Sequence, residues 1–143
     1  MAFTKFFALS LCFIFLILSI IHIYWALGGQ WGIDKALPMN EGGEKTMNPS
    51  FLATIIVAIG LAVFSMFYLL ETGWSGILLP NWLLSLASWS IPSIFLLRAL
   101  GDFKYAGFFK KITHTDFAKW DTRLYTPLCL FIGSLGIIIA LVG

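Results

Sequence analysis

Four long apolar stretches alternate with polar connections along the chain. They cover residues 6–27, 49–70, 77–100 and 125–142, and charged residues are nearly absent from them. About 20 consecutive apolar residues are enough to cross a bilayer as an α-helix. The pattern predicts an all-α, polytopic membrane protein, with one integral membrane domain over residues 1–143 that forms a four-transmembrane-helix bundle.

Composition supports this interpretation. The chain of 143 residues is 59% hydrophobic and 11% charged, whereas soluble domains carry about 25% charged residues. Its mean hydropathy is +0.92. The net charge is only +2, and the basic residues are interleaved with aspartates and aromatics, which argues against nucleic-acid binding. The composition therefore excludes a soluble globular domain and indicates a membrane protein.

The basic residues are distributed unevenly between the two sides of the predicted membrane. Four spans place both termini on one side, and the only basic residue there is Lys5, because the turn at 71–76 has none. The other eight of the nine basic residues lie in or beside the two longer loops. Because lysine and arginine are enriched in cytoplasmic loops, we expect these loops to be cytoplasmic and both termini outside.

Small and polar residues recur at helical spacing in three of the spans. They are Thr54, Ala58, Ala62 and Ser65 in the second span, Asn81, Ser85, Ser88 and Pro92 in the third, and Cys129, Gly133, Gly136 and Ala140 in the fourth. Small faces of this kind let membrane helices approach closely. They predict a compact bundle; the alternative is an exposed face on which a partner protein docks.

His22 is the only ionisable residue well inside a predicted span, and a group at that depth is a candidate functional residue because leaving it unpaired is costly. The alternative is a neutral imidazole bonded to a nearby carbonyl. Arg98 closes the third span at the same level, where it either snorkels toward headgroups or forms a charge-assisted pair with Asp102. If the third loop folds back, these three residues line one polar pocket.

Both long loops contain signals of order. In the third loop, Thr115 can cap a short helix that begins at Asp116. Its apolar face would contain Phe117, Trp120 and Leu124, which predicts an interfacial amphipathic helix. The first loop, residues 28–48, is longer than a typical structureless connection. The two loops are thus expected to be ordered, either as the mouth of a pocket or as a structural lid.

Several chemistries have no motif in the chain. It lacks Walker, Rossmann and HExxH patterns, and Cys12 and Cys129 lie in apolar runs without a C-x-x-C pair, which argues against a quinone or vitamin K epoxide reductase mechanism. No carboxylate lies inside any predicted span, which argues against a proton-coupled exporter with an acidic first helix. We therefore expect neither a metal nor a cofactor.

Four sequence blocks resemble a known family. They are HIYWALGG from residue 22, LRALGDFKYAG from residue 97, TDFAKWD from residue 115 and YTPLCL from residue 125. This combination resembles the small bacterial four-helix membrane proteins of domain of unknown function 3995, over nearly the whole chain. The resemblance implies a bacterial inner-membrane protein. It implies no activity, substrate or catalytic residue.

The leading functional hypothesis is a membrane protein that binds a lipid-like or other amphiphilic molecule in a cytoplasm-facing pocket. The predicted pocket residues are His22, Trp25, Trp31, Arg98, Asp102, Tyr105, Trp120 and Asp121. Arg98 would meet an anionic headgroup, the aromatics would contact the apolar part, and Asp102 would orient Arg98. Membrane lipids are the expected partners, with a membrane protein as a further candidate.

Two other classes of function remain open. One is a membrane enzyme acting on a lipidic substrate, with His22 as general acid or base and Asp102 or Asp121 as its partner. The other is a structural or accessory subunit of a membrane complex, for which the small-residue faces would be the docking surface.

Overall fold

The computed structural model describes all 143 residues, and its regular elements are all helical. The four long helices are α1 (Ala2–Ala26), α3 (Phe51–Glu71), α4 (Asn81–Leu100) and α6 (Thr126–Val142). The short elements are α2 (Ile33–Ala36), α5 (Asp116–Trp120) and the π-helix η1 (Asp121–Tyr125). Four helical segments, the last running from Asp116 to Val142, are long and apolar enough to cross a membrane. The predicted all-helical architecture with four spans is therefore confirmed.

Two of the helices begin at side-chain caps. The hydroxyl of Ser50 accepts a hydrogen bond from the backbone N–H of Ala53 and starts α3. The hydroxyl of Thr115 does the same for Ala118 at the start of α5. Each cap satisfies a backbone donor that the first turn would otherwise leave free. The N-cap predicted at Thr115 is confirmed.

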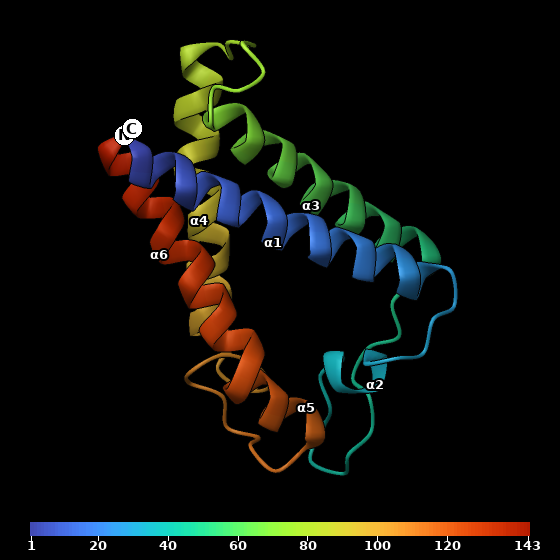
Figure 1. Ribbon diagram of the computed structural model, residues 1–143. Coiled ribbons are helices and arrows are strands. Elements are labelled where there is room, and N and C mark those ends of the chain that lie inside the picture. Colours follow the sequence, from blue (N-terminus) through green and yellow to red (C-terminus); the bar gives the residue numbers. More distant parts are fainter.

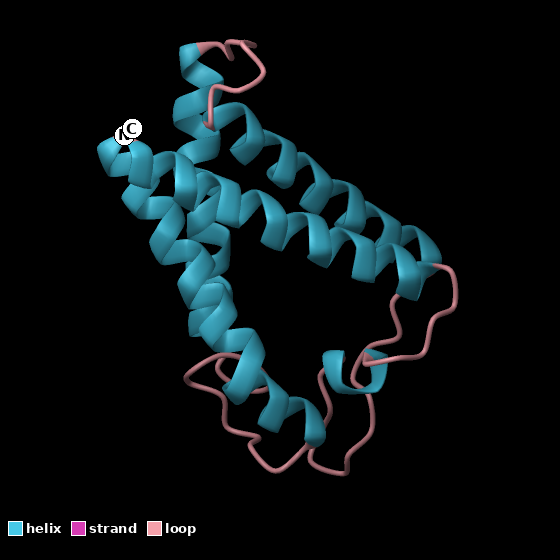
Figure 2. Ribbon diagram, in the orientation of Figure 1, coloured by secondary structure: helices cyan, strands magenta, loops and turns pink.

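The long helices form two hairpins rather than one compact bundle. Helix α1 packs along α3, and α4 packs along α6. The hairpins meet mainly through α1 and α6, at the end where the two chain termini lie, and diverge from there toward the loops (Figures 1 and 2). The arrangement is thus more open than the compact bundle that the small-residue faces predict.

Side-chain size explains how closely α6 packs on α4 near the core. A Cβ atom on Gly133 would lie 2.5 Å from Leu96 Cγ, and one on Gly136 would lie 2.7 Å from Pro92 Cβ, so glycine is needed where α6 crosses α4. Phe15 stacks on Tyr68 nearby, with ring centroids 5.8 Å apart. The buried core lies mainly in the halves of the helices that are nearer the chain termini. It consists of Ala8, Leu11, Cys12, Phe15, Leu61, Phe67, Tyr68, Ile91, Ile132, Leu135 and Ile139.

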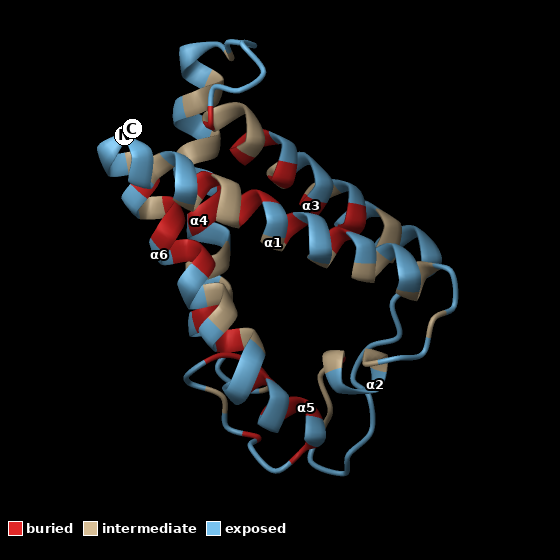
Figure 3. Cartoon of the chain, in the orientation of Figure 1, coloured by how far each residue is buried: buried red, intermediate tan, exposed pale blue.

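Two hydrogen bonds join α1 to α3 inside the apolar region. The hydroxyl of Ser19 donates to the carbonyl of Ala58 over 2.7 Å, and that of Ser65 donates to the carbonyl of Cys12 over 2.8 Å. All four of these residues are buried. Figure 3 shows the buried segments along α1 and α3. The small faces of α3 and α6 are therefore used largely within the monomer, although Ala62 remains exposed.

The two long loops contact one another at the wide end, where α2 packs against α5 (Figure 1). The Tyr125 hydroxyl donates to the Lys35 carbonyl over 3.0 Å. The Lys35 ammonium lies 5.2 Å from the centre of the Trp120 ring, and Nε2 of His114 lies 2.8 Å from the Glu41 carbonyl oxygen. These contacts connect the loops across the space between the hairpins.

Candidate functional site

The carboxylate of Asp121 is completely buried and accepts four hydrogen bonds. Its Oδ1 accepts from Nη2 of Arg98 over 2.8 Å. Its Oδ2 accepts from the Gly107 backbone N–H (2.8 Å), the Thr126 hydroxyl (3.1 Å) and the Lys110 ammonium (3.2 Å). A buried carboxylate is tolerated only when it is paired and hydrogen-bonded in this way. Asp121 therefore fixes the end of α4, the third loop and the start of α6 in one cluster.

The π-helical turn explains how Thr126 reaches Asp121. Pro127 has no backbone N–H, and in an α-helix its ring would clash with the carbonyl four residues earlier, at Arg123. The helix widens into η1 immediately before this proline. Thr126, five residues after Asp121, then donates its hydroxyl back to the Asp121 carboxylate. Widened turns of this kind are frequent at functional sites.

Two glycines let the third loop fold tightly against the end of α4. Gly101 and Gly107 both have positive φ, at 85° and 88°. A Cβ atom on Gly101 would lie 1.8 Å from the carbonyl oxygen of Ala106, and one on Gly107 would lie 2.4 Å from the carbonyl oxygen of Leu100. No side chain fits between these backbone segments. The close approach brings the Gly107 N–H to Asp121.

Asp102 shapes this loop and does not bind Arg98. Its Oδ1 accepts hydrogen bonds from the backbone N–H groups of Lys104, Tyr105 and Ala106, at 3.0, 2.7 and 3.1 Å. Burial alone would raise the pKa of Asp102, but these donors outweigh it and hold the pKa below its usual value. The predicted pair of Arg98 with Asp102 is wrong, because α4 ends at Gly101 and helical i, i+4 spacing does not continue past it.

Arg98 retains an unused donor. Its Nη2 is bound to Asp121, but its Nη1 is buried and has no hydrogen-bond partner. Lys110 is also buried, with 6% of its side chain exposed, and binds the same carboxylate. Two cations thus share one carboxylate, so the cluster keeps a net positive charge. A buried donor without a partner is unfavourable unless something accepts its hydrogen bond.

A cavity of about 490 Å³ lies between the two hairpins, and Arg98 is part of its wall. The other polar wall residues are His22 on α1, Tyr125 at the start of α6 and Cys129 one turn further along α6. The rest of the wall is apolar and includes Leu18, Val57, Phe64, Ile94 and Phe95. Ala36 of α2 closes one side. The cavity is therefore an apolar cleft with polar groups gathered toward the loop end.

His22 reaches this cleft through its ring. Its Nδ1 lies 2.7 Å from the carbonyl oxygen of Leu18 in the same helix, and its ring meets Trp25 edge to face at 5.1 Å. The ring forms no hydrogen bond to a carboxylate, because its one hydrogen-bond partner is Leu18 and the partners of Asp102 and Asp121 do not include it. His22 therefore has no carboxylate partner within the chain for acid–base catalysis. Because Nδ1 already has a carbonyl partner, Nε2 is the atom available to a ligand.

The structure brings together some of the predicted pocket residues and separates others. His22, Trp25 and Arg98 line the cleft, with Asp121 directly behind Arg98. Trp31 is 75% exposed and does not line the cleft. Its backbone carbonyl accepts a hydrogen bond from Trp25 Nε1 over 2.8 Å, and its backbone N–H donates to the Tyr24 hydroxyl over 3.3 Å. The three others, Asp102, Tyr105 and Trp120, lie in the loops and do not line the cleft.

Three residues that matter to the site were missed by the sequence reasoning. Tyr125 and Cys129 line the cleft. Lys110, interpreted from the sequence as a topology determinant, is buried against Asp121. Pro127 could have predicted the irregular turn before α6, because a proline in a helix disturbs the carbonyl four residues earlier. Nothing in the spacing of Lys110 distinguishes it from the neighbouring Lys111.

A family model described as "Protein of unknown function (DUF3995)" matches residues 15–136. The chain belongs to this family. The match covers the cleft, the Asp121 cluster and both long loops, and so agrees with the resemblance noted from the sequence blocks. No curated protein and no solved structure matches the chain.

Proposed function

We propose that this DUF3995 protein binds an amphiphile with an anionic headgroup in the cleft between its hairpins. The observation that carries the proposal is the buried, unpartnered Nη1 of Arg98, on a guanidinium that lines the cleft. An anionic oxygen at this point would supply the missing acceptor. It would also neutralise the positive charge left over when Arg98 and Lys110 share Asp121.

Arginine is well suited to this role. Its planar guanidinium presents several donors in a fixed fork that matches a carboxylate or phosphate. Asp121 holds one side of the fork at Nη2 and thereby fixes the orientation of the group, so that Nη1 is preorganised. Nε2 of His22 would add a further polar contact, and the Tyr125 ring would pack beside the ligand.

The remainder of the cleft would hold the apolar part of the ligand. Most of its wall consists of aliphatic and aromatic side chains, contributed by all four long helices. The wall residues Val57 and Gly60 on α3 lie across from Ile94 and Phe95 on α4, and these two helices make few direct contacts. An acyl or isoprenoid chain could therefore enter from the bilayer between α3 and α4.

The proposal includes a location and an orientation. We place the protein in a bacterial inner membrane because of the resemblance noted from the sequence blocks. We place both termini outside and the two long loops in the cytoplasm on the basis of the lysine and arginine distribution. In that orientation the exposed Trp120 and Leu124 would lie at the cytoplasmic surface of the membrane. A membrane-impermeant maleimide should label Ser75→Cys in intact cells, and Gly42→Cys only after permeabilisation. The opposite labelling pattern would contradict this orientation.

Native mass spectrometry of the purified protein tests the binding proposal. We expect a bound mass that extraction identifies as an acidic amphiphile, and a marked loss of that mass in Arg98→Gln. Lys111→Gln, which removes an exposed charge from the same loop, should retain the ligand. Protein that carries no amphiphile, and that acidic amphiphiles do not stabilise against heat, would refute the proposal.

A further inference from the structure

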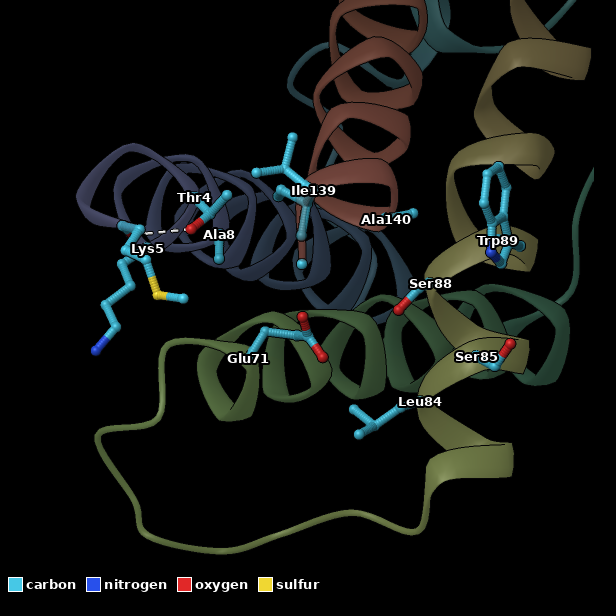
Figure 4. Close-up of a pocket in the computed structure, with 13 residues that line it drawn as sticks. Thr4, Lys5, Ala8, Glu71, Leu84, Ser85, Ser88, Trp89, Ile139 and Ala140 are labelled. Carbon is cyan, nitrogen blue, oxygen red and sulfur yellow. Dashed lines mark hydrogen bonds between the residues drawn. The ribbon is translucent and has the colours of Figure 1, made fainter.

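A second cavity, of about 450 Å³, is lined by residues close to both ends of the chain, among them Thr4, Lys5, Ile139 and Ala140 (Figure 4). It therefore lies at the opposite end of the helices from the cleft. Its wall includes Ala8 of α1, Glu71 of α3, Ser88 and Trp89 of α4 and Ala140 of α6. All four long helices thus contribute to it. The sequence reasoning ended the second span at residue 70, but α3 continues to Glu71, which places a carboxylate at the end of a membrane helix.

The carboxylate of Glu71 forms no ion pair within the chain. The three ion pairs of the protein use only Asp34 and Asp121 as acids, and no side-chain hydrogen bond involves Glu71. Lys5 also lines the cavity wall, but its ammonium points away from Glu71 in Figure 4. The side chain is also partly buried, so the charge is not fully solvated by water.

The position of Glu71 at the end of α3 makes this part of the cavity more negative. It is the last residue of α3, and the carboxyl end of a helix carries a partial negative charge that disfavours an anion and favours a cation. The carboxylate is directed toward Ser88 on α4, whose hydroxyl offers a further oxygen (Figure 4). A cation between these helices would be stabilised by the carboxylate, the helix end and the hydroxyl together.

The remaining wall decides which kind of cation fits. A divalent metal ion needs several carboxylate or other oxygen ligands, whereas no group of three or more metal-ligating side chains occurs in the chain. About half of the wall is apolar, including Leu84 and Ile139. Such a wall suits an ammonium group that carries apolar substituents.

We propose that this second cavity binds a singly charged organic ammonium ion, with Glu71 as its counter-ion. The site is independent of the anionic-amphiphile proposal, because it shares no residue with the cleft and lies at the other end of the helices. The two proposals can therefore fail separately.

Isothermal titration calorimetry on protein in nanodiscs of zwitterionic lipid tests the proposal, with benzyltrimethylammonium as the probe and neopentylbenzene as its uncharged isostere. We expect saturable binding of the cation only, weakened about tenfold or more by Glu71→Gln because the half-buried charge partner is lost. Ser88→Leu, which fills the cavity and leaves the charge in place, should also weaken it.

Two controls separate this site from non-specific charge effects and from the cleft. Glu41→Gln removes an exposed acid of the first loop, and Arg98→Gln alters the cleft; neither should change the affinity for the cation. Unchanged melting temperatures would show that Glu71→Gln and Ser88→Leu are folded. Binding that survives both variants, equal binding of the uncharged isostere, or no binding to the wild type would each overturn the proposal.

Discussion

Nη2 of Arg98 lies 2.8 Å from Oδ1 of Asp121, and this ion pair joins the last turn of α4 to the segment that leads into α6. The two side chains differ in exposure, since Asp121 is fully buried and Arg98 is 35% exposed. The pair is therefore anchored on the aspartate side, while the arginine side reaches the cleft. The third loop is closed by this contact across 23 residues of chain.

Removing the Asp121 carboxylate should destabilise the protein strongly. In Asp121→Ala, Arg98 and Lys110 lose their shared acceptor, and breaking a buried pair by deleting one partner costs about 3–5 kcal/mol. The measurement is the free energy of unfolding in mixed micelles. The exposed pair of Asp34 with Lys45 provides the control, and Asp34→Ala should change stability by about 1 kcal/mol or less. Equal effects of the two substitutions would contradict the role given to Asp121.

The close approach between Gly101 and Gly107 should be equally sensitive. An alanine at either position places its Cβ within 2.5 Å of backbone atoms that cannot move aside without opening the loop. We expect each substitution to lower the free energy of unfolding by about 3 kcal/mol or more.

Gly43→Ala separates steric conflict from backbone strain. Gly43 also has positive φ, at 79°, but nothing lies within 4 Å of the position its Cβ would take. It should lose only about 1 kcal/mol, which is the strain of a left-handed alanine. If Gly43→Ala proved as damaging as Gly101→Ala, backbone strain rather than close packing would explain both.

The Arg98 site illustrates what spacing along a sequence can and cannot predict. The sequence placed Arg98, Asp102 and Asp121 among the site residues, but paired Arg98 with the nearer aspartate. Helical i, i+4 adjacency requires the helix to continue, and it stops at Gly101. The actual partner lies 23 residues away, and its position depends on the folded loop and the π-helical turn. No local pattern encodes that distance.

The Tyr125 hydroxyl should contribute measurably to the link between the loops. Tyr125→Phe removes the hydrogen bond to the Lys35 carbonyl but keeps the ring that packs on Phe117, at 6.0 Å. We expect a loss of about 1 kcal/mol of local stability, seen as faster amide hydrogen exchange around residues 33–37. Tyr105→Phe is the matched control, because no hydrogen bond involves the Tyr105 hydroxyl. Unchanged exchange in Tyr125→Phe would mean that the loops are held by other contacts.

The four helices were predictable because twenty apolar residues in a row leave few alternatives, but their arrangement was not. Small residues predict that helices approach closely, but they do not predict over what part of their length the helices stay in contact. The glycines Gly133 and Gly136 bring α6 close to α4, whereas the larger Phe64 and Phe95 pack on Phe15 and also line the cleft. The resulting divergence of the hairpins, and hence the cleft, depends on three-dimensional packing. The same limit concealed Glu71, which lies one residue past the predicted span.

The central claim is that Arg98 presents a preorganised cation to an anionic amphiphile, and a binding titration tests it most directly. Dansylaminoundecanoic acid would be titrated into nanodiscs that contain the wild type, Arg98→Gln or Lys111→Gln, with dansyl fluorescence as the signal. Both variants remove one positive charge, but only Arg98 lines the cleft. The corresponding long-chain alcohol, labelled in the same way, reports binding that needs no charge.

We predict saturable binding of the acid to the wild type and to Lys111→Gln, at least about tenfold weaker binding to Arg98→Gln, and weak binding of the alcohol to all three. Equal affinities of the acid for the wild type and Arg98→Gln, or of the acid and the alcohol for the wild type, would contradict the account.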